Sequence, residues 1–292
     1  MELDLRSVQR ASRRAGDFDP QDAILARRSG EELVERLGLL NFVPEVILDL
    51  GCGAGTESRT LAERFPVAYV VGLDICPLPL HTQSSERNWV PVAGNANSLP
   101  FAKATFDLVF ANLVLPWCNP DAALKEVRRI LKPGGVVVFS TLGPDTLKEL
   151  RVAWEHVDDH PHVHSFADMH NVGDALLGAG FTEPVVDADR VYFSYGELKK
   201  LVDDLRALGA TNALAGRRRS LTGKNRWQAF ANACHSNAPQ QERLQATFEL
   251  IYGVAWASKQ SETPNMGVRV DLPHYRASYF GYTLRLKPAK IH

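Results

Sequence analysis

The order of apolar and polar residues predicts strands that alternate with helices along the first half of the chain. Short continuous apolar runs are typical of strands buried on both faces, and they occur at 46–50, 68–73, 106–113 and 136–141. Helical spacing of apolar residues occurs at 29–40, 56–65 and 121–131, and the last of these ends at the turn sequence Lys-Pro-Gly-Gly. This alternation predicts a parallel sheet covered by helices on both faces.

The pattern changes after Gly143. Helices are predicted at 147–157, through 174–177, at 197–208 and at 227–234. Residues 185–186 and 191–193 are weak strand candidates, whereas 247–256 has the β-branched and aromatic content of a strand. Residues 216–226 are polar and basic.

Bulk composition narrows the class of protein. The 292 residues suffice for one large domain or for a domain with a sizeable insertion, and the formal net charge of -1 gives no overall attraction to nucleic acid or an anionic membrane. The four cysteines form neither a CxxC pair nor a disulfide framework, which favours a reducing compartment. The first residues lack the apolar core of a signal peptide, and no apolar run approaches the length of a membrane span. We therefore expect a cytoplasmic protein.

A glycine-rich loop follows the first predicted strand. Gly51, Gly53 and Gly55 alternate with single residues, and Asp49 stands two residues before them. Glycine has no Cβ, so such a loop lets a ligand approach the backbone. The spacing is not that of the dinucleotide motif GxGxxG, because Thr56 occupies the last position. Alone, the loop is also compatible with a tight turn that binds nothing.

Further motifs follow this loop in order. Asp74 ends the next strand, where a carboxylate can accept both hydroxyls of a ribose, and Gly94-Asn95-Ala96 precedes the strand at 106–113. Together with Asp49 and the Lys-Pro-Gly-Gly turn, this set resembles the class I S-adenosylmethionine-dependent methyltransferases. The resemblance implies a doubly wound, mostly parallel, Rossmann-like α/β sheet of seven strands, the last one antiparallel, with a helical lid insertion.

The same resemblance assigns the cofactor, S-adenosylmethionine, to these motifs. It implies that the glycine loop lies against the methionine part, that Asp74 binds the ribose, and that Asn95 with Ala96 lies at the adenine. Methyltransferases of this class usually have Asp at the position of Asn95. The amide oxygen of Asn95 accepts a weaker hydrogen bond than a carboxylate would.

Segments outside this core are similar to one family, the malonyl-acyl-carrier-protein O-methyltransferases of biotin synthesis. They are residues 111–118, 142–154, 160–181, 205–217 and 251–256. The resemblance implies methylation of the free carboxyl group of a malonyl thioester, the first step of the pimeloyl arm. The acceptor would be malonyl on acyl carrier protein or on coenzyme A.

This reaction needs alignment rather than a base, because a carboxyl group with a pKa of about 4 is already ionised at neutral pH. A cation should orient the carboxylate, and Arg217 is the first candidate because the family's GATxxxxGR segment ends on it. Its alternative role is a solvated loop charge, and Arg151 is a structural charge. Asn112 and Trp117 follow the fourth core strand and are expected to line the methyl-transfer site. The alternative role of Trp117 is core packing under the next helix.

Two other groups of residues are candidates for the site. Five histidines between 156 and 170 have no zinc-like spacing, so we expect no metal and assign the loop to a lid or its hinge. Phe18 stands where the family has the tyrosine of a Tyr-Asp pair, and its ring can shield the cofactor from water. Arg13 or Arg14 is expected to reach the methionine carboxylate, with simple solvation of the helix as the alternative.

The predicted organisation has five parts. They are an N-terminal helical segment (1–44), the cofactor-binding core (45–194), a helical lid (195–245), the last core strand (246–258) and a tail of unknown role (259–292). Two other functions stay open at this point. One is a methyltransferase of a quinone or another small molecule, and the other is a methyltransferase-like assembly factor for respiratory complex I, which need not methylate. No nucleic-acid partner is expected.

Overall fold

The computed structural model describes residues 2–76, 89–236 and 243–259, together with the backbone of 275–280 and 283–288. Its helical elements are α1 (Leu5–Ala15), η1 (Pro20–Asp22), α2 (Ile24–Leu37), α3 (Thr56–Arg64), η3 (Leu115–Trp117), α4 (Pro120–Ile130), α5 (Lys148–Glu155), α6 (Met169–Gly178), α7 (Leu198–Ala207) and α8 (Lys224–Ser236). Its strands are β1 (Val46–Leu50), β2 (Tyr69–Asp74), β3 (Trp89–Ala93), β4 (Phe106–Ala111), β5 (Leu131–Leu142), β6 (Phe181–Tyr195), β7 (Leu244–Ala257), β8 (Tyr275–Phe280) and β9 (Thr283–Pro288).

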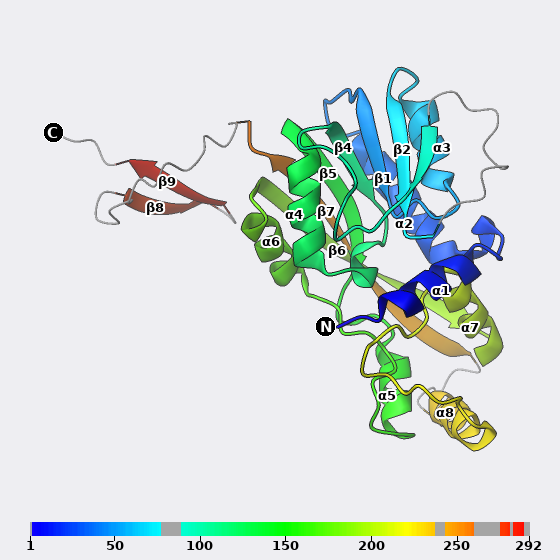
Figure 1. Ribbon diagram of the computed structural model, residues 1–292. Coiled ribbons are helices and arrows are strands. Elements are labelled where there is room, and N and C mark those ends of the chain that lie inside the picture. The colour runs from blue at the N-terminus through cyan, green and yellow to red at the C-terminus, as the bar shows by residue number, and fades with distance from the viewer. Residues whose placement is uncertain (1, 77–88, 237–242, 260–274, 281–282, 289–292) are drawn as a thin grey trace.

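Seven strands form one sheet in the order β3-β2-β1-β4-β5-β7-β6 (Figure 1). β1 pairs in parallel with both β2 and β4, whereas β7 runs antiparallel to β5 and β6. The predicted doubly wound, mostly parallel sheet of seven strands with an antiparallel last strand is confirmed. The strand order reverses between β1 and β4, and ligands of such sheets bind outside the carboxyl ends of the strands at this point.

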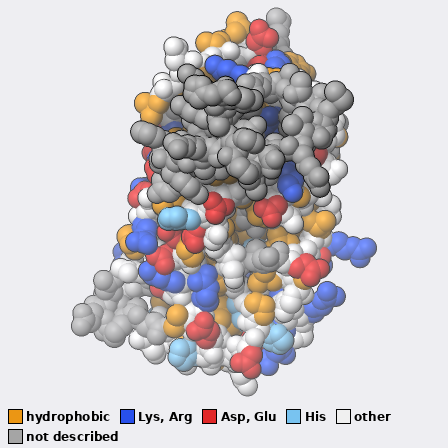
Figure 2. All heavy atoms as spheres, turned by 90° about the vertical axis from the view of Figure 1, so that its left-hand side faces the viewer, with side chains coloured by type: hydrophobic (Ala, Val, Ile, Leu, Met, Phe, Trp, Pro, Cys, Tyr) orange, Lys and Arg blue, Asp and Glu red, His pale blue; other side chains and the backbone are white. Residues whose placement is uncertain are grey.

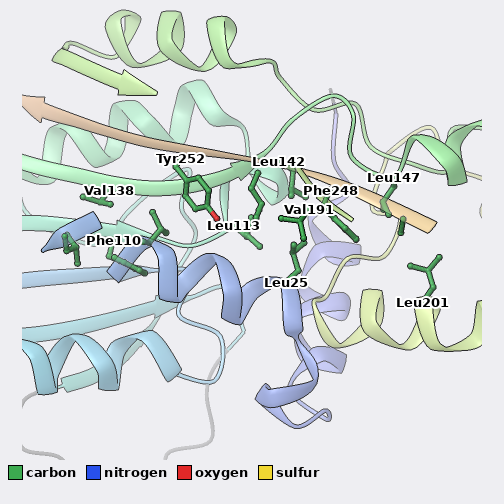
Figure 3. Packing of buried hydrophobic residues seen from close by; sticks show 14 of the residues in the cluster. Leu25, Phe110, Leu113, Val138, Leu142, Leu147, Val191, Leu201, Phe248 and Tyr252 are labelled. Carbon is green, nitrogen blue, oxygen red and sulfur yellow. The ribbon is translucent and has the colours of Figure 1, made fainter. Parts of the chain in front are cut away.

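Helices cover both faces of the sheet, as the buried runs predict. One apolar cluster packs α2 and α3 against the sheet, and the other packs α4 and α6 on the opposite face. Side chains of a strand alternate between faces, so Ile47 belongs to the first cluster and Leu48 to the second. Figure 3 shows that the first cluster continues from Phe110 on the sheet past Leu142 to Leu201 on α7. The hydrophobic core therefore extends from the sheet to α7, a helix of the segment between β6 and β7.

Both edges of the sheet differ from the sequence expectation. β6 is one continuous strand rather than two fragments, because it pairs with β7 along almost its whole length, from Phe181 to Tyr195, while most of its side chains stay partly or fully exposed. β3 has no clear apolar pattern and contains Pro91. Its only described partner is β2, and an edge strand tolerates proline because one row of its backbone groups needs no ladder partner.

Helix ends also shift. α2 begins at Ile24, five residues before the predicted start. The sequence pattern missed this first turn because only Leu25 is buried there, and the exposed Arg27 and Arg28 interrupt the apolar spacing. α7 and α8 lie between β6 and β7, within the predicted lid segment 195–245. Figure 1 shows α5 and α8 together at one end of the molecule and α1 beside α7. A lid function for these helices stays a prediction.

The remaining features of the fold are the distribution of surface charge and the strands of the tail. On the face drawn in Figure 2, acidic and basic side chains are interspersed below the grey atoms, in accordance with the near-zero net charge. Within the predicted tail, β8 pairs antiparallel with β9, and residues 260–274, 281–282 and 289–292 lie outside the described residues. Among the helices of the described residues, none is long and apolar enough to cross a bilayer.

Candidate functional site

The glycine loop lies at the carboxyl end of β1, where the strand order reverses. All three glycines have positive φ, at 77° for Gly51, 50° for Gly53 and 80° for Gly55. A Cβ on Gly51 would lie 2.7 Å from the side chain of Val114, and one on Gly55 would lie 2.7 Å from the ring of Trp89. A Cβ on Gly53 would meet nothing within 4 Å. Two glycines therefore pack inward, and Gly53 leaves open space in front of the loop.

Asp74 at the end of β2 joins this loop to the N-terminal helix. Its carboxylate accepts hydrogen bonds from the backbone N–H of Gly53 at 3.1 Å and of Cys76 at 2.9 Å. It also accepts one from Ser12 Oγ of α1 at 3.0 Å, a contact that the sequence did not predict. The carboxylate and the open side of Gly53 thus belong to one constellation, covered by α1.

Asp49 lies beneath the loop, 1% exposed, and accepts a hydrogen bond from Ser58 Oγ at 2.6 Å. Burial, reinforced by the negative charge of Glu57, raises the pKa of Asp49 to about 8. Burial also raises the pKa of Glu57. No Lys or Arg forms an ion pair with either carboxyl group within the described residues, so burial below the loop favours the protonated form of both groups.

Asn112 completes this interior network. Its Nδ2 donates to Glu57 Oε1 at 2.9 Å and to the Ala26 carbonyl at 2.8 Å, and its Oδ1 accepts from Ser140 Oγ at 2.8 Å. The structure therefore places Asn112 among α2, α3 and β5. Its predicted role at the transferred methyl group stays a prediction. The sequence analysis missed Glu57 and Ser140, because partners so far apart in the chain leave no local pattern.

The adenine-side turn follows β3. Asn95 Oδ1 accepts a hydrogen bond from the Asn97 backbone N–H at 2.9 Å, and Ala96 is buried. Since a carbonyl oxygen has two lone pairs, Asn95 keeps acceptor capacity for a ligand amine. At the N-terminal end of the site, Phe18 is half-buried after α1 and Arg13 is exposed on that helix.

A cavity of about 160 Å³ lies beyond the carboxyl ends of β4 and β5 and is bounded by α5, α7 and α8. Its aromatic lining consists mainly of Trp117, Trp154, Phe166, Trp227, Phe230 and Phe248, and we call it the aromatic cavity. Trp117, predicted near the methyl-transfer site, thus lies in its wall. Cys118 beside it is buried, and burial raises the pKa of its thiol to about 12, which makes it a poor nucleophile.

Three stacked rings form one wall of the aromatic cavity. The Trp154 ring stacks on His162 at a centroid distance of 3.7 Å and on Phe230 at 4.1 Å. His162 Nε2 lies 2.8 Å from Asp158 Oδ1. His164 accepts a hydrogen bond from the Ala213 backbone N–H at Nε2, and burial lowers its pKa to about 4. Among the described side chains, no three His, Cys, Asp or Glu residues are placed to hold a metal ion.

Arg217 lies outside the lining of this cavity. Its Nη2 donates to Asp4 Oδ2 at 2.8 Å and to Ser7 Oγ at 2.6 Å, and its Nη1 donates to the Leu214 carbonyl at 2.8 Å. These bonds hold the pKa of Asp4 down at about 2. Arg217 therefore fastens the loop after α7 to the start of α1, and its predicted role toward a substrate stays a prediction. The predicted structural part of Arg151 agrees with its bonds to backbone carbonyls, that of His164 among them.

Known proteins resemble this chain at two levels. Residues 48–139 match the family described as "Methyltransferase domain". A malonyl-acyl-carrier-protein O-methyltransferase of Nitrosospira multiformis is 40% identical over 276 residues, covering 87% of this chain and 89% of its own length. The chain belongs to the malonyl-acyl-carrier-protein O-methyltransferase family. A second member, from Gallionella capsiferriformans, is 38% identical and covers 87% of this chain and 91% of its own length.

Membership in this family confirms the resemblance drawn from the segments outside the cofactor core, and with it the predicted class of enzyme, an O-methyltransferase. It favours the enzyme over the assembly-factor alternative. The YcgJ protein of Bacillus subtilis has the same fold, with a TM-score of 0.57 at 15% identity over 79% of this chain and 99% of its own. At that identity the likeness supports the fold alone.

Proposed function

We propose that the protein transfers the methyl group of S-adenosylmethionine to the free carboxyl group of a malonyl thioester carried on acyl carrier protein, the first step of the pimeloyl arm of biotin synthesis. The observation that carries the proposal is one arrangement at the carboxyl edge of the sheet. A glycine loop with an open face and a ribose-type carboxylate lie at the switch point, and the aromatic cavity lies beyond the carboxyl ends of β4 and β5. Relatives named for this reaction, at about 40% identity, support the choice of acceptor.

The residues present fit the cofactor. The open side of Gly53 gives the methionine part access to the backbone, and Asp74 offers acceptors to the ribose hydroxyls. Asn95 has acceptor capacity for the adenine amine, and α1 reaches the site through Ser12. The ring of Phe18, which follows α1, would shield the cofactor from water. Asp49 supports the loop from beneath through Ser58. The cofactor supplies a methyl group bonded to a positively charged sulfur.

The acceptor needs no base. Transfer would join the methyl carbon to a carboxylate oxygen, and the bonding electron pair would leave with the sulfur as a neutral thioether. The protein contributes by aligning the oxygen with the carbon–sulfur bond and by removing water from the oxygen. The apolar walls of the aromatic cavity, Trp117 among them, suit this removal of water.

The test incubates the purified protein with S-adenosylmethionine and malonyl acyl carrier protein and follows the acyl group by mass spectrometry. Gain of one methyl group that is lost again on ester hydrolysis supports the proposal. Malonyl coenzyme A and free malonate, at equal concentration, establish which carrier is preferred. Absence of methyl ester on every malonyl acceptor, while S-adenosylmethionine binds, would overturn it and leave a small-molecule acceptor.

A further inference from the structure

The carboxylate of Asp74 uses most of its capacity as an acceptor on donors of the protein itself. Its Oδ1 accepts from Ser12 Oγ at 3.0 Å and from the Cys76 backbone N–H at 2.9 Å, and its Oδ2 accepts from the Gly53 N–H at 3.1 Å. A carboxylate has about four lone-pair positions, two on each oxygen. Donors from the described part of the chain therefore take both positions on Oδ1 and one of the two on Oδ2.

The proposed function asks the same carboxylate to accept both hydroxyls of a ribose, and the inference below rests on that function. Two ribose hydroxyls bring the donors to five, whereas a carboxylate offers about four positions. A ribose that places one hydroxyl at each oxygen finds a position on Oδ2, so the shortage falls on Oδ1. One of the two protein donors on Oδ1 therefore has to give way when the ribose binds.

Ser12 is the donor on Oδ1 that yields more easily. The Cys76 N–H belongs to the backbone two residues after Asp74, so it turns away only if the chain itself turns. The Ser12 hydroxyl leaves the carboxylate by one rotation about its Cα–Cβ bond, from one staggered rotamer to another. A serine within a helix can then donate to the carbonyl four residues back, which for Ser12 is that of Val8.

The helix α1 does not have to move for this exchange. Near its start, Asp4 is held by Arg217 Nη2 at 2.8 Å. At its end, Ala15 packs on Gly209, where an added Cβ would lie 3.6 Å from that of Ala15. Ser12 is half-buried between these two anchors. The serine therefore stays beside the carboxylate while the ribose is bound and can return to Oδ1 when the ribose leaves.

We propose that Ser12 is a further residue of the cofactor site and that it competes with a ribose hydroxyl for Oδ1 of Asp74. Ser12 thereby lowers the affinity of the site for every ligand that carries this ribose, S-adenosylmethionine and the demethylated product S-adenosylhomocysteine alike. Differences in affinity at one site lie mostly in the rate of dissociation. The competition therefore speeds release of the product, whose ribose meets the same serine.

The experiment compares Ser12→Ala with the wild-type protein and with a control, Ser236→Ala. Alanine is the best helix former, so Ser12→Ala removes the hydroxyl and leaves α1 intact. Ser236 is exposed at the end of α8 and donates to the Asn232 carbonyl at 3.0 Å, so the control removes a helical serine hydroxyl outside the cofactor site. Calorimetry gives the dissociation constants of S-adenosylmethionine, S-adenosylhomocysteine and the 2′,3′-dideoxy analogue of S-adenosylhomocysteine. Melting temperatures without ligand compare the stability of the three proteins.

We expect Ser12→Ala to bind S-adenosylmethionine and S-adenosylhomocysteine roughly three- to tenfold more tightly than the wild-type protein, the scale of one hydrogen bond to a charged group. The dideoxy analogue brings no ribose donor, so its affinity should be the same in Ser12→Ala and the wild-type protein. Ser236→Ala should match the wild-type protein within about twofold for all three ligands, the usual scale of a neutral surface substitution. A gain in affinity is diagnostic, because a variant that only damages the fold loses affinity.

Three results would overturn the inference alone, with the cofactor still bound by the wild-type protein. Ser12→Ala could bind S-adenosylhomocysteine no more tightly than the wild-type protein, the gain could persist in full with the dideoxy analogue, or Ser236→Ala could show the same gain. Wild-type protein that binds neither S-adenosylmethionine nor S-adenosylhomocysteine would instead overturn the cofactor assignment of the proposed function, and the role of Ser12 with it.

Discussion

The two halves of the candidate site are built in opposite ways. The cofactor half consists of polar groups that are already satisfied by one another, since Asp74 accepts three hydrogen bonds and the amide of Asn112 makes three. The acceptor half, the aromatic cavity, is lined mostly by aromatic rings and leucines, and its polar lining residues are His162, His164, Thr211 and Asn212. The first half is suited to hold a polar nucleoside through fixed acceptors. The second is suited to strip water from a single carboxylate.

The substitution expected to impair the cofactor half most, while leaving the acceptor half intact, is Gly53→Ala. Its φ of 50° makes alanine cost about 1 kcal/mol of stability, and the added methyl would stand in the open space that the ligand needs. We expect cofactor affinity to fall roughly 10- to 100-fold, as for other overpacked contacts. Calorimetric titration with S-adenosylmethionine measures this loss.

Gly180→Ala is the matched control, because Gly180 also has positive φ, at 88°, and lies outside the site. It should carry the same cost in stability and leave cofactor affinity unchanged. Equal losses of affinity in the two variants would mean that backbone strain, rather than a ligand at Gly53, explains the result.

The same contrast explains what the sequence could predict. The cofactor half depends on neighbours in the chain, since Gly51, Gly53 and Gly55 form one turn and Asp74 ends the next strand, so a local motif identified it. The acceptor half joins Trp154, His162 and Phe230 from three separate segments. No spacing rule connects such residues, and the histidines could be judged only against a metal pattern.

Long-range contacts also explain the other features that the sequence did not predict. The motif drew attention to Arg217, but its bonds to Asp4 and Ser7 span more than 200 positions and were not predictable, and its role toward a substrate stays a prediction. The strand β6 was underestimated because an edge strand shows few buried side chains, although its backbone pairs fully. Both Arg217 and β6 are held by hydrogen bonds to residues far away in the chain, and the local sequence pattern does not contain those partners.

A smaller effect on the cofactor half is expected for Asp74→Asn. The amide keeps the shape of the side chain but loses the charge that strengthens its hydrogen bonds, so affinity for S-adenosylmethionine should fall about tenfold. Asp187→Asn is the control, since Asp187 is exposed on β6 and pairs with Arg36. If Asp74→Asn binds the cofactor like the wild-type protein, the ribose assignment fails.

The acceptor half is probed by Phe230→Leu. Phe230 is 2% exposed and stacks on Trp154, so the smaller side chain should lower the free energy of unfolding by about 1–3 kcal/mol and loosen α8. KM for the malonyl acceptor should rise severalfold while cofactor affinity stays the same. Leu221→Ala, at a side chain 94% exposed in the same segment, serves as the control for both readouts. A loss of cofactor affinity in Phe230→Leu would show that the two halves are not independent.

The smallest effect concerns the protons stored below the glycine loop. The pKa of Asp49 is raised from 3.8 to about 8, so the folded protein keeps a proton that the unfolded chain releases above pH 4. Stability therefore falls as pH rises from about 4 to 8. Asp49→Asn imitates the protonated carboxyl group and should raise the melting temperature of the cofactor-free protein more at pH 8 than at pH 5. Glu57, whose pKa is also raised by burial, leaves some dependence of stability on pH in the variant.

Thermal unfolding at the two pH values, with exposed Asp187→Asn as the control, tests this prediction. An equal gain at both pH values would mean that Asp49 is ionised in the folded protein and that its negative charge, rather than a stored proton, lies beneath the cofactor.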